Sequence, residues 1–208
     1  MKIFETTKLE FRRKILVLAG AKIDVTDSAT GALVGFIKMK AFKLREEIKL
    51  YSDTQQTQLL LSINARQIID FGATYDVTPA EQQQTAFSLR RQGLRSTFVR
   101  DKWMIIGSNN DEYGFFEETG TFAIVRRYIA MIPFIGGLVD FVFFFMTIDY
   151  KLYVTSSGEQ LHAATLTRKK NPFVIKYNTS TENMQTTIDP QIVVAAGTML
   201  TIIEVTKN

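Results

Sequence analysis

The sequence from Asp189 to Val205 is DPQIVVAAGTMLTIIEV, and this stretch decides the fold. Asp189 is a good helix cap, and Pro190 suits the first helical position, where its missing N–H costs nothing. Residues 190–203 carry no charge and offer no polar face, which is typical of a buried helix. At 1.5 Å per residue that helix would reach only about 20 Å, whereas the core of a bilayer is about 30 Å thick. We therefore predict a central helix over 189–205 that is enclosed by protein.

The alternative for this stretch is a buried β-strand, because Ile and Val are frequent in it. The pair Ala195-Ala196 at its centre and the Asp-Pro start favour the helix. An apolar helix with no polar face needs a shell, and an all-β shell is the economical solution.

Alternating apolar and polar residues run through most of the first two thirds of the chain. Examples are residues 22–26, 33–39 and 59–63, which are rich in β-branched and aromatic side chains. Turn signals separate such runs; three that predict hairpins are residues 28–31, 108–111 and 156–158. Many short strands at even spacing predict a sandwich or barrel. We expect one mainly β domain over residues 1–208, α+β by content.

A weak internal repeat is also visible. Its three units open with KIDVT at residue 22, TYDVT at residue 74 and KLYVT at residue 151. After each opening come a turn, a strand, a basic cluster and a further strand. The clusters are Lys38, Lys40 and Lys43, then Arg90, Arg91 and Arg95, and finally Arg168, Lys169 and Lys170. The repeat predicts that the basic clusters recur at equivalent corners of the sheet.

Composition excludes several kinds of site. The 208 residues include no Cys, which excludes disulfides, Cys-ligated metals and thiol catalysis. The only histidine, His162, has no nucleophile pattern beside it, and none of the common catalytic or nucleotide-binding motifs is present. We expect no enzyme activity, no catalytic residue, no metal and no cofactor. The formal net charge of +4 is mild and does not predict a nucleic-acid partner.

A second apolar segment spans residues 128–148 and is expected to be helical, inserted within the domain. Three alternatives stay open for it: a covered helix pair, a hairpin dipping into lipid, or a true membrane span. Asp140, Pro133 and Gly136-Gly137 disfavour a span. The candidate membrane or oligomer contacts are Phe134, Phe141, Phe143, Phe144 and Phe145. The N-terminus lacks an apolar signal segment, so the prediction is a cytoplasmic protein that associates with membranes if this segment does.

Four short runs resemble a known family. They are FKLREEI at residues 42–48, RRQGLRS at 90–96, RDKW at 100–103 and NPFV at 171–174. These runs, their spacing and the apolar C-terminal helix resemble the tubby C-terminal-like superfamily, in particular its LURP-one-related and phospholipid-scramblase-like branches, over roughly the whole chain. The resemblance implies a closed antiparallel barrel of about twelve strands around a central C-terminal helix. It also implies phosphoinositide binding through basic barrel residues, as in tubby-type members, or a link to phospholipid movement, as in scramblase-like members.

Calcium-dependent phospholipid movement is not expected here. The acidic segment that binds calcium in scramblases would fall near residues 178–189, where this chain has only Glu182 and Asp189.

Two functions follow from these observations. The first is a lipid- or membrane-surface-binding barrel whose partner is an anionic phospholipid. The candidate headgroup ligands are Lys38, Lys40, Arg90, Arg91, Arg168, Lys169 and Lys170. The alternative is a soluble interaction module that forms homo-oligomers through residues 128–148. Solvation of strand edges is the plainer explanation for the basic clusters.

Overall fold

A computed structural model describes residues 2–14, 20–40, 47–67, 73–92, 101–119, 148–169 and 174–203. Two helices lie in these ranges, α1 (Lys2–Glu5) and α5 (Pro190–Ile203). The strands in the same ranges are β1 (Lys8–Arg13), β2 (Ala21–Asp27), β3 (Leu33–Lys40), β4 (Glu47–Tyr51), β5 (Leu59–Gln67), β6 (Thr74–Pro79), β7 (Phe87–Arg91), β8 (Lys102–Gly107), β9 (Glu112–Thr119), β10 (Asp149–Ser156), β11 (Glu159–Arg168) and β12 (Lys176–Ser180).

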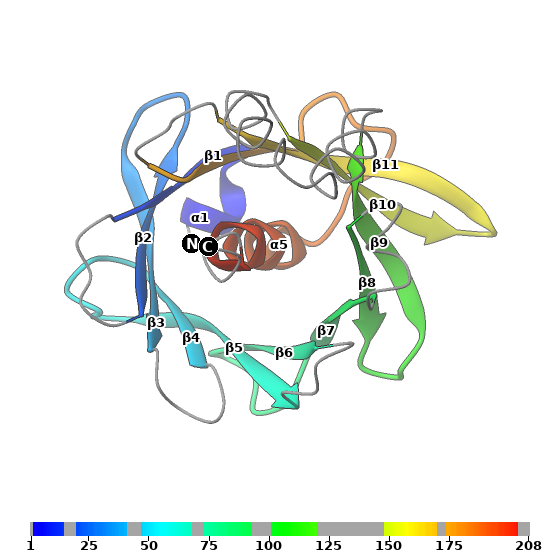
Figure 1. Ribbon diagram of the computed structural model, residues 1–208, viewed down its shortest axis with the longest axis horizontal. Coiled ribbons are helices and arrows are strands. Elements are labelled where there is room, and N and C mark those ends of the chain that lie inside the picture. Colours follow the sequence, from blue (N-terminus) through cyan, green and yellow to red (C-terminus); the bar gives the residue numbers. More distant parts are fainter. Residues whose placement is uncertain are drawn as a thin grey trace, which may run out of the picture.

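These twelve strands of the described residues form one closed barrel, which is antiparallel throughout (Figure 1). Each strand pairs with its neighbours in sequence, and β1 closes the ring by pairing with β12, with Leu9 opposite Thr179 and Phe11 opposite Tyr177. Closure leaves no free sheet edge, which removes the usual route to edge-to-edge aggregation. The mainly β barrel predicted from the sequence is confirmed.

Helix α5 lies inside the ring of strands (Figure 1). The side chain of Asp189 accepts a hydrogen bond from the backbone N–H of Gln191 at 2.9 Å, so it caps the helix as predicted. Every residue from Ile192 to Ile202 is buried, which is why this helix needs no polar face. The buried hydroxyls of Thr198 and Thr201 donate to backbone carbonyls one turn earlier, at 2.7 Å each, so neither is left unpaired.

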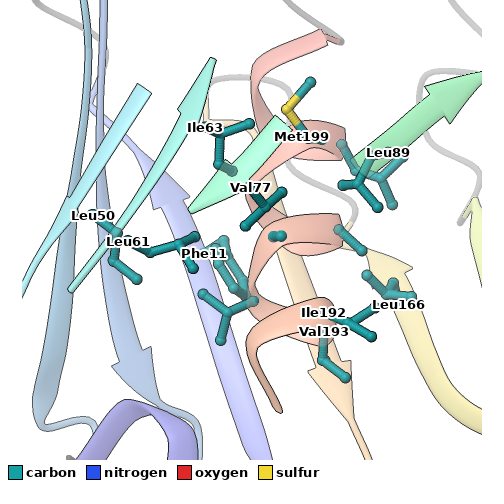
Figure 2. Close-up of a cluster of buried hydrophobic side chains, with 14 of the residues drawn as sticks. Phe11, Leu50, Leu61, Ile63, Val77, Leu89, Leu166, Ile192, Val193 and Met199 are labelled. Carbon is teal, nitrogen blue, oxygen red and sulfur yellow. The ribbon is translucent and has the colours of Figure 1, made fainter. Parts of the chain in front are cut away.

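The core consists of apolar side chains that point from the strands onto α5. Figure 2 shows side chains gathered around the helix that carries Met199, among them Ile63, Val77, Leu89 and Phe11. Along several strands the buried positions alternate with partly exposed ones, as in β6, where Tyr75 and Val77 are buried. The two-residue period of the strands therefore supplies the inner wall, and the helix fills the space that a twelve-strand barrel would otherwise leave open.

The two ends of the barrel differ because consecutive strands run in opposite directions. At one end, which we call the turn end, lie the connections after β2, β4, β6, β8 and β10. The predicted hairpins at residues 28–31, 108–111 and 156–158 are all found there. Helix α5 starts at the turn end, after β12. The chain leaves β1, β3, β5, β7, β9 and β11 at the opposite end, which we call the basic end because Lys and Arg side chains gather there.

The second apolar segment joins β9 to β10 and lies outside the described residues except for Ile148. Ile148 is half-buried and packs against the barrel core. The flanking residues Thr119 and Asp149 are opposite each other in the sheet, at the basic end.

Candidate anionic-ligand surface

Acidic side chains gather at the turn end of the barrel. Within the described residues, those at or beside this end are Glu5, Asp27, Asp53, Glu81, Asp111, Glu112, Glu159, Glu182 and Asp189. The basic residues of that part are Lys2 and Lys8, and the Lys8 ammonium is 2.6 Å from the Glu182 carboxylate. This end therefore presents a negative surface.

Basic side chains gather in the opposite half of the barrel. In the described ranges these are Arg12, Arg13, Lys14, Lys22, Lys38, Lys40, Lys49, Arg66, Arg90, Arg91, Lys102, Lys151, Arg168, Lys169 and Lys176. The acids of the same half are fewer: Asp24, Glu47, Asp76, Asp101, Glu117, Glu118 and Asp149, with Glu10 midway along β1, 3.3 Å from the Lys176 ammonium. The small net charge of the chain thus conceals a strong separation of charge along the barrel axis.

The three basic clusters found in the sequence repeat occupy regularly spaced positions around this end. They end β3, β7 and β11, which are separated by four strands each in a closed ring of twelve. The units of the repeat begin at β2, β6 and β10, again four strands apart. Within the described residues, the clusters therefore lie a third of the circumference from one another.

A row of three lysines crosses the outer wall of β2, β3 and β4. Lys22 is directly opposite Lys38, and Lys38 is directly opposite Lys49. Like charges in this arrangement destabilise a sheet unless something compensates them. Lys49 is compensated by Glu47 at 2.9 Å, and the hydrogen bond to that carboxylate raises the Lys49 pKa although burial opposes the shift.

The other two lysines of this row are less well compensated. Lys38 donates to the side-chain oxygen of Gln56 at 3.3 Å, which is a neutral partner. In the described part of the chain the exposed ammonium of Lys22 has no ion pair or hydrogen bond. Lys40, at the exposed end of β3, is opposite Glu47, the carboxylate already bound to Lys49. This corner offers positive charge to an external anion.

A small hollow of about 190 Å³ lies on the outer wall beside β7 and extends from Arg90 to the connection after β8 at the turn end. Its lining includes Arg66, Arg90, Ser88 and Asn110. Arg66 holds Asp76 with two hydrogen bonds, from Nε to Oδ2 at 2.9 Å and from Nη2 to Oδ1 at 2.6 Å. The Ser88 hydroxyl donates to the same carboxylate at 2.6 Å.

Electrostatics in this hollow favour an anion. Burial raises the pKa of Asp76, but the hydrogen bonds from Arg66 and Ser88 outweigh burial and lower the pKa overall. Asp76 therefore stays ionised and neutralises Arg66. The exposed guanidinium of Arg90 is left without such a partner among the described residues, so the hollow carries one uncompensated positive charge.

Two of the predicted headgroup ligands lie in the wall of the barrel rather than on its outer face. Arg91 is bound to Asp101 through Nε–Oδ1 at 2.9 Å and Nη2–Oδ2 at 3.1 Å, and its guanidinium carbon is 5.7 Å from the centroid of the Trp103 ring. Arg168 is only 9% exposed. Lys169 is exposed at the start of the next connection, and Lys170 lies outside the described residues.

The sequence alone did not identify Lys22, Arg66 or the separation of charge between the ends. The sequence did contain a signal that Arg91 points inward. Phe87, Leu89 and Arg91 share one face of a strand, and the apolar members of that face must point inward. The five phenylalanines predicted as membrane or oligomer contacts, from Phe134 to Phe145, lie outside the described residues.

The described ranges hold neither a cluster of metal ligands nor a membrane-spanning helix. No cluster of three or more His, Asp or Glu side chains is placed there to hold a metal ion. In the same ranges no helix has both the length and the apolar character needed to cross a bilayer.

Comparison of the chain with protein families, with curated proteins and with solved structures finds no match to it.

Proposed function

We propose that the protein is a non-enzymatic barrel that binds anionic phospholipid surfaces with its basic end. The observation that supports this most is the separation of charge along the barrel axis. A bilayer with anionic lipids attracts each nearby Lys or Arg by about 1 kcal/mol. It repels the acidic turn end, so an approach with the basic end first is favoured.

The geometry of the basic corners supports the same orientation. The exposed described members of the three clusters, Lys40, Arg90 and Lys169, are spaced around the barrel and can face a flat surface together, whereas a nucleic-acid strand needs one continuous groove or stripe. The phenylalanines predicted to contact a membrane or another copy lie in the sequence between Thr119 and Asp149, two residues at this rim. Charge attraction together with an apolar anchor is the usual combination for a peripheral membrane protein.

A phosphate group is the chemistry that the hollow beside β7 suits. Guanidinium groups bind phosphate oxygens with paired, charge-assisted hydrogen bonds. Arg90 is free to do so, and Arg66 is held in place by Asp76. The resemblance to the tubby-like superfamily implies phosphoinositide binding by basic barrel residues, and it supports the proposal independently of this geometry.

Co-sedimentation of the full chain with vesicles tests the proposal. We expect binding to phosphatidylcholine vesicles that contain phosphatidylserine or a phosphoinositide, and little binding to pure phosphatidylcholine. Binding should weaken strongly between low salt and about 0.5 M salt, because salt shortens the range of charge attraction. Equal binding to neutral vesicles, or no binding to anionic vesicles at low salt, would contradict the proposal.

Sedimentation velocity without lipid tests the alternative function. A stable oligomer that ignores vesicles would favour the self-associating module. Binding to a nucleic acid in preference to vesicles would likewise exclude the phospholipid as the main partner.

A further inference from the structure

A cavity of about 500 Å³ lies at the turn end of the barrel, on the opposite side from the basic end. Helix α1, the ends of β1 and β12, residues 181–188 and the first turns of α5 enclose it. Small-molecule sites have volumes of about 300–1,000 Å³, so the cavity is large enough for a compact ligand.

Hydrogen bonds fix the walls of the cavity on both sides. Gln185 is bound to β11 twice, because its backbone N–H donates to the His162 carbonyl at 2.9 Å and its side-chain oxygen accepts from the His162 N–H at 2.8 Å. On the other side, the Thr181 N–H donates to the Thr7 carbonyl at 3.0 Å. The Glu182 carboxylate accepts from the Thr7 hydroxyl at 3.0 Å. The cavity is therefore largely formed before any ligand arrives.

The inner part of the cavity is apolar. Ile3, Leu9, Ala163, Val193 and Val194 line it, and each of them is 4% exposed or less. Half-buried Phe4, Met184 and Ile188 extend this apolar surface toward the opening. Such a floor favours a hydrocarbon portion of a ligand.

The outer part is lined by polar residues, and the hydroxyl protons of several of its threonines are already used. The Thr6 hydroxyl donates to the Lys2 carbonyl at 2.7 Å. The hydroxyls of Thr181 and Thr186 also donate to carbonyls, those of Thr7 and Thr187. A hydroxyl that donates in this way still has lone pairs to accept a hydrogen bond. These threonines therefore suit a ligand that donates.

Charge around the cavity disfavours an anion. Glu5 is the charged residue of its lining, and no Lys or Arg among the described residues contributes to it. Asp189 lies beside the same loop, as does Glu182, whose carboxylate is paired with Lys8 at 2.6 Å. The hydroxyl protons of Thr6, Thr181 and Thr186 are not available to a carboxylate ligand, and Glu5 in the lining disfavours a second negative charge there.

We propose that this cavity binds an uncharged, mainly apolar small molecule with a hydroxyl donor, of the class of medium-chain fatty alcohols. This site is separate from the surface proposed above for anionic phospholipids. It disfavours anions, whereas that surface favours them. The hydrocarbon chain lies against the apolar floor, and the hydroxyl group donates to the threonines at the opening.

Displacement of a neutral fluorescent probe tests the proposal. 1-Aminoanthracene should gain fluorescence saturably with the full chain at pH 8. Decan-1-ol should displace it at a concentration at least about tenfold lower than decanoate, which is ionised at that pH. Absence of saturable probe binding, or displacement by decanoate as readily as by decanol, would overturn it.

Variants that fill the cavity test whether the probe binds inside it. Ala163→Leu fills the floor of the cavity, and Met184→Trp narrows its opening from the loop. If Ala163→Leu does not fold, Met184→Trp still tests whether the probe binds in the cavity. Each should raise the dissociation constant of the probe at least about tenfold. Ala32→Leu makes the same chemical change on an exposed turn at the same end and should leave binding unchanged. Unchanged binding in both folded cavity variants would show that the probe binds elsewhere, and the proposal would fail.

Discussion

The guanidinium of Arg91 and the carboxylate of Asp101 form a two-point ion pair in the barrel wall, with nitrogen–oxygen distances of 2.9 and 3.1 Å. The Asp101 side chain is only 4% exposed, and the Tyr150 hydroxyl donates to the same carboxylate at 3.3 Å. The pair joins β7 to the start of β8 across the connection at the basic end. A charge this deeply buried is tolerated only because its partner is in place.

Replacing Asp101 by Asn should therefore lower the free energy of unfolding by about 3 kcal/mol. This value is near the lower limit for breaking a buried ion pair, because 27% of the Arg91 side chain is exposed. Denaturant unfolding measures the change. The double variant Arg91→Met/Asp101→Leu removes both charges and should recover most of the loss. If Asp101→Asn is as stable as the parent, the ion pair contributes nothing to the stability of the fold.

Contact between α5 and β1 limits the side chain at Gly197. A Cβ added there would lie 2.7 Å from Cε2 and 2.8 Å from Cζ of the buried Phe11 ring. Gly197→Ala should therefore destabilise the fold by about 1–2 kcal/mol, although Ala favours a helix by about 1 kcal/mol over Gly.

A double-mutant cycle with Phe11→Leu checks the cause. Shortening the ring should relieve the clash, so the cost of Gly197→Ala should be smaller in the Phe11→Leu background. Strictly additive free energies of unfolding would show that the two residues do not meet.

The single histidine gives a pH dependence that can be assigned. Burial lowers the pKa of His162 below its ordinary value, and the nearby charge of Lys151 lowers it further. The hydrogen bond between the His162 Nε2 and the Ala164 carbonyl, 3.0 Å long, acts in the opposite direction and raises the pKa. In the unfolded chain the pKa is about 6.5, so the unfolded state binds more protons between the two pKa values. Stability should fall as the pH falls below about 6.5 toward the folded-state pKa.

His162→Gln should remove that part of the pH dependence of the free energy of unfolding. Proton NMR of the imidazole ring measures the folded-state pKa directly. A midpoint at or above about 6.5 would contradict the expected direction.

The architecture was predictable in part because two strong local signals agree. Asp189 and Pro190 mark the start of α5, and the uncharged run that follows has no place except inside a shell. The period-two pattern and the turn residues predict hairpins, and the structure has them. The number of strands came from the family resemblance, since pattern alone does not separate a sandwich from a barrel.

The surface was harder to predict because it depends on which way each side chain points. Arg90 and Arg91 are neighbours in the sequence, yet the first lines an outer hollow and the second binds Asp101 in the wall. The separation of charge could be predicted only with the strand order in hand. Every second connection lies at the same end because consecutive strands pair antiparallel around the ring. The cavity at the turn end has no sequence signal, since it forms between segments that are far apart in the chain.

The central claim is that the basic end binds an anionic surface, and a pair of matched variants tests it most directly. Lys22→Gln/Lys38→Gln removes two charges from the basic half, and Lys2→Gln/Lys8→Gln removes two from the turn end. We expect the first variant to bind phosphatidylserine vesicles about thirtyfold more weakly at low salt, which corresponds to about 2 kcal/mol, and the second to bind like the parent. Equal effects of the two variants would show that only net charge matters, and would contradict the claim.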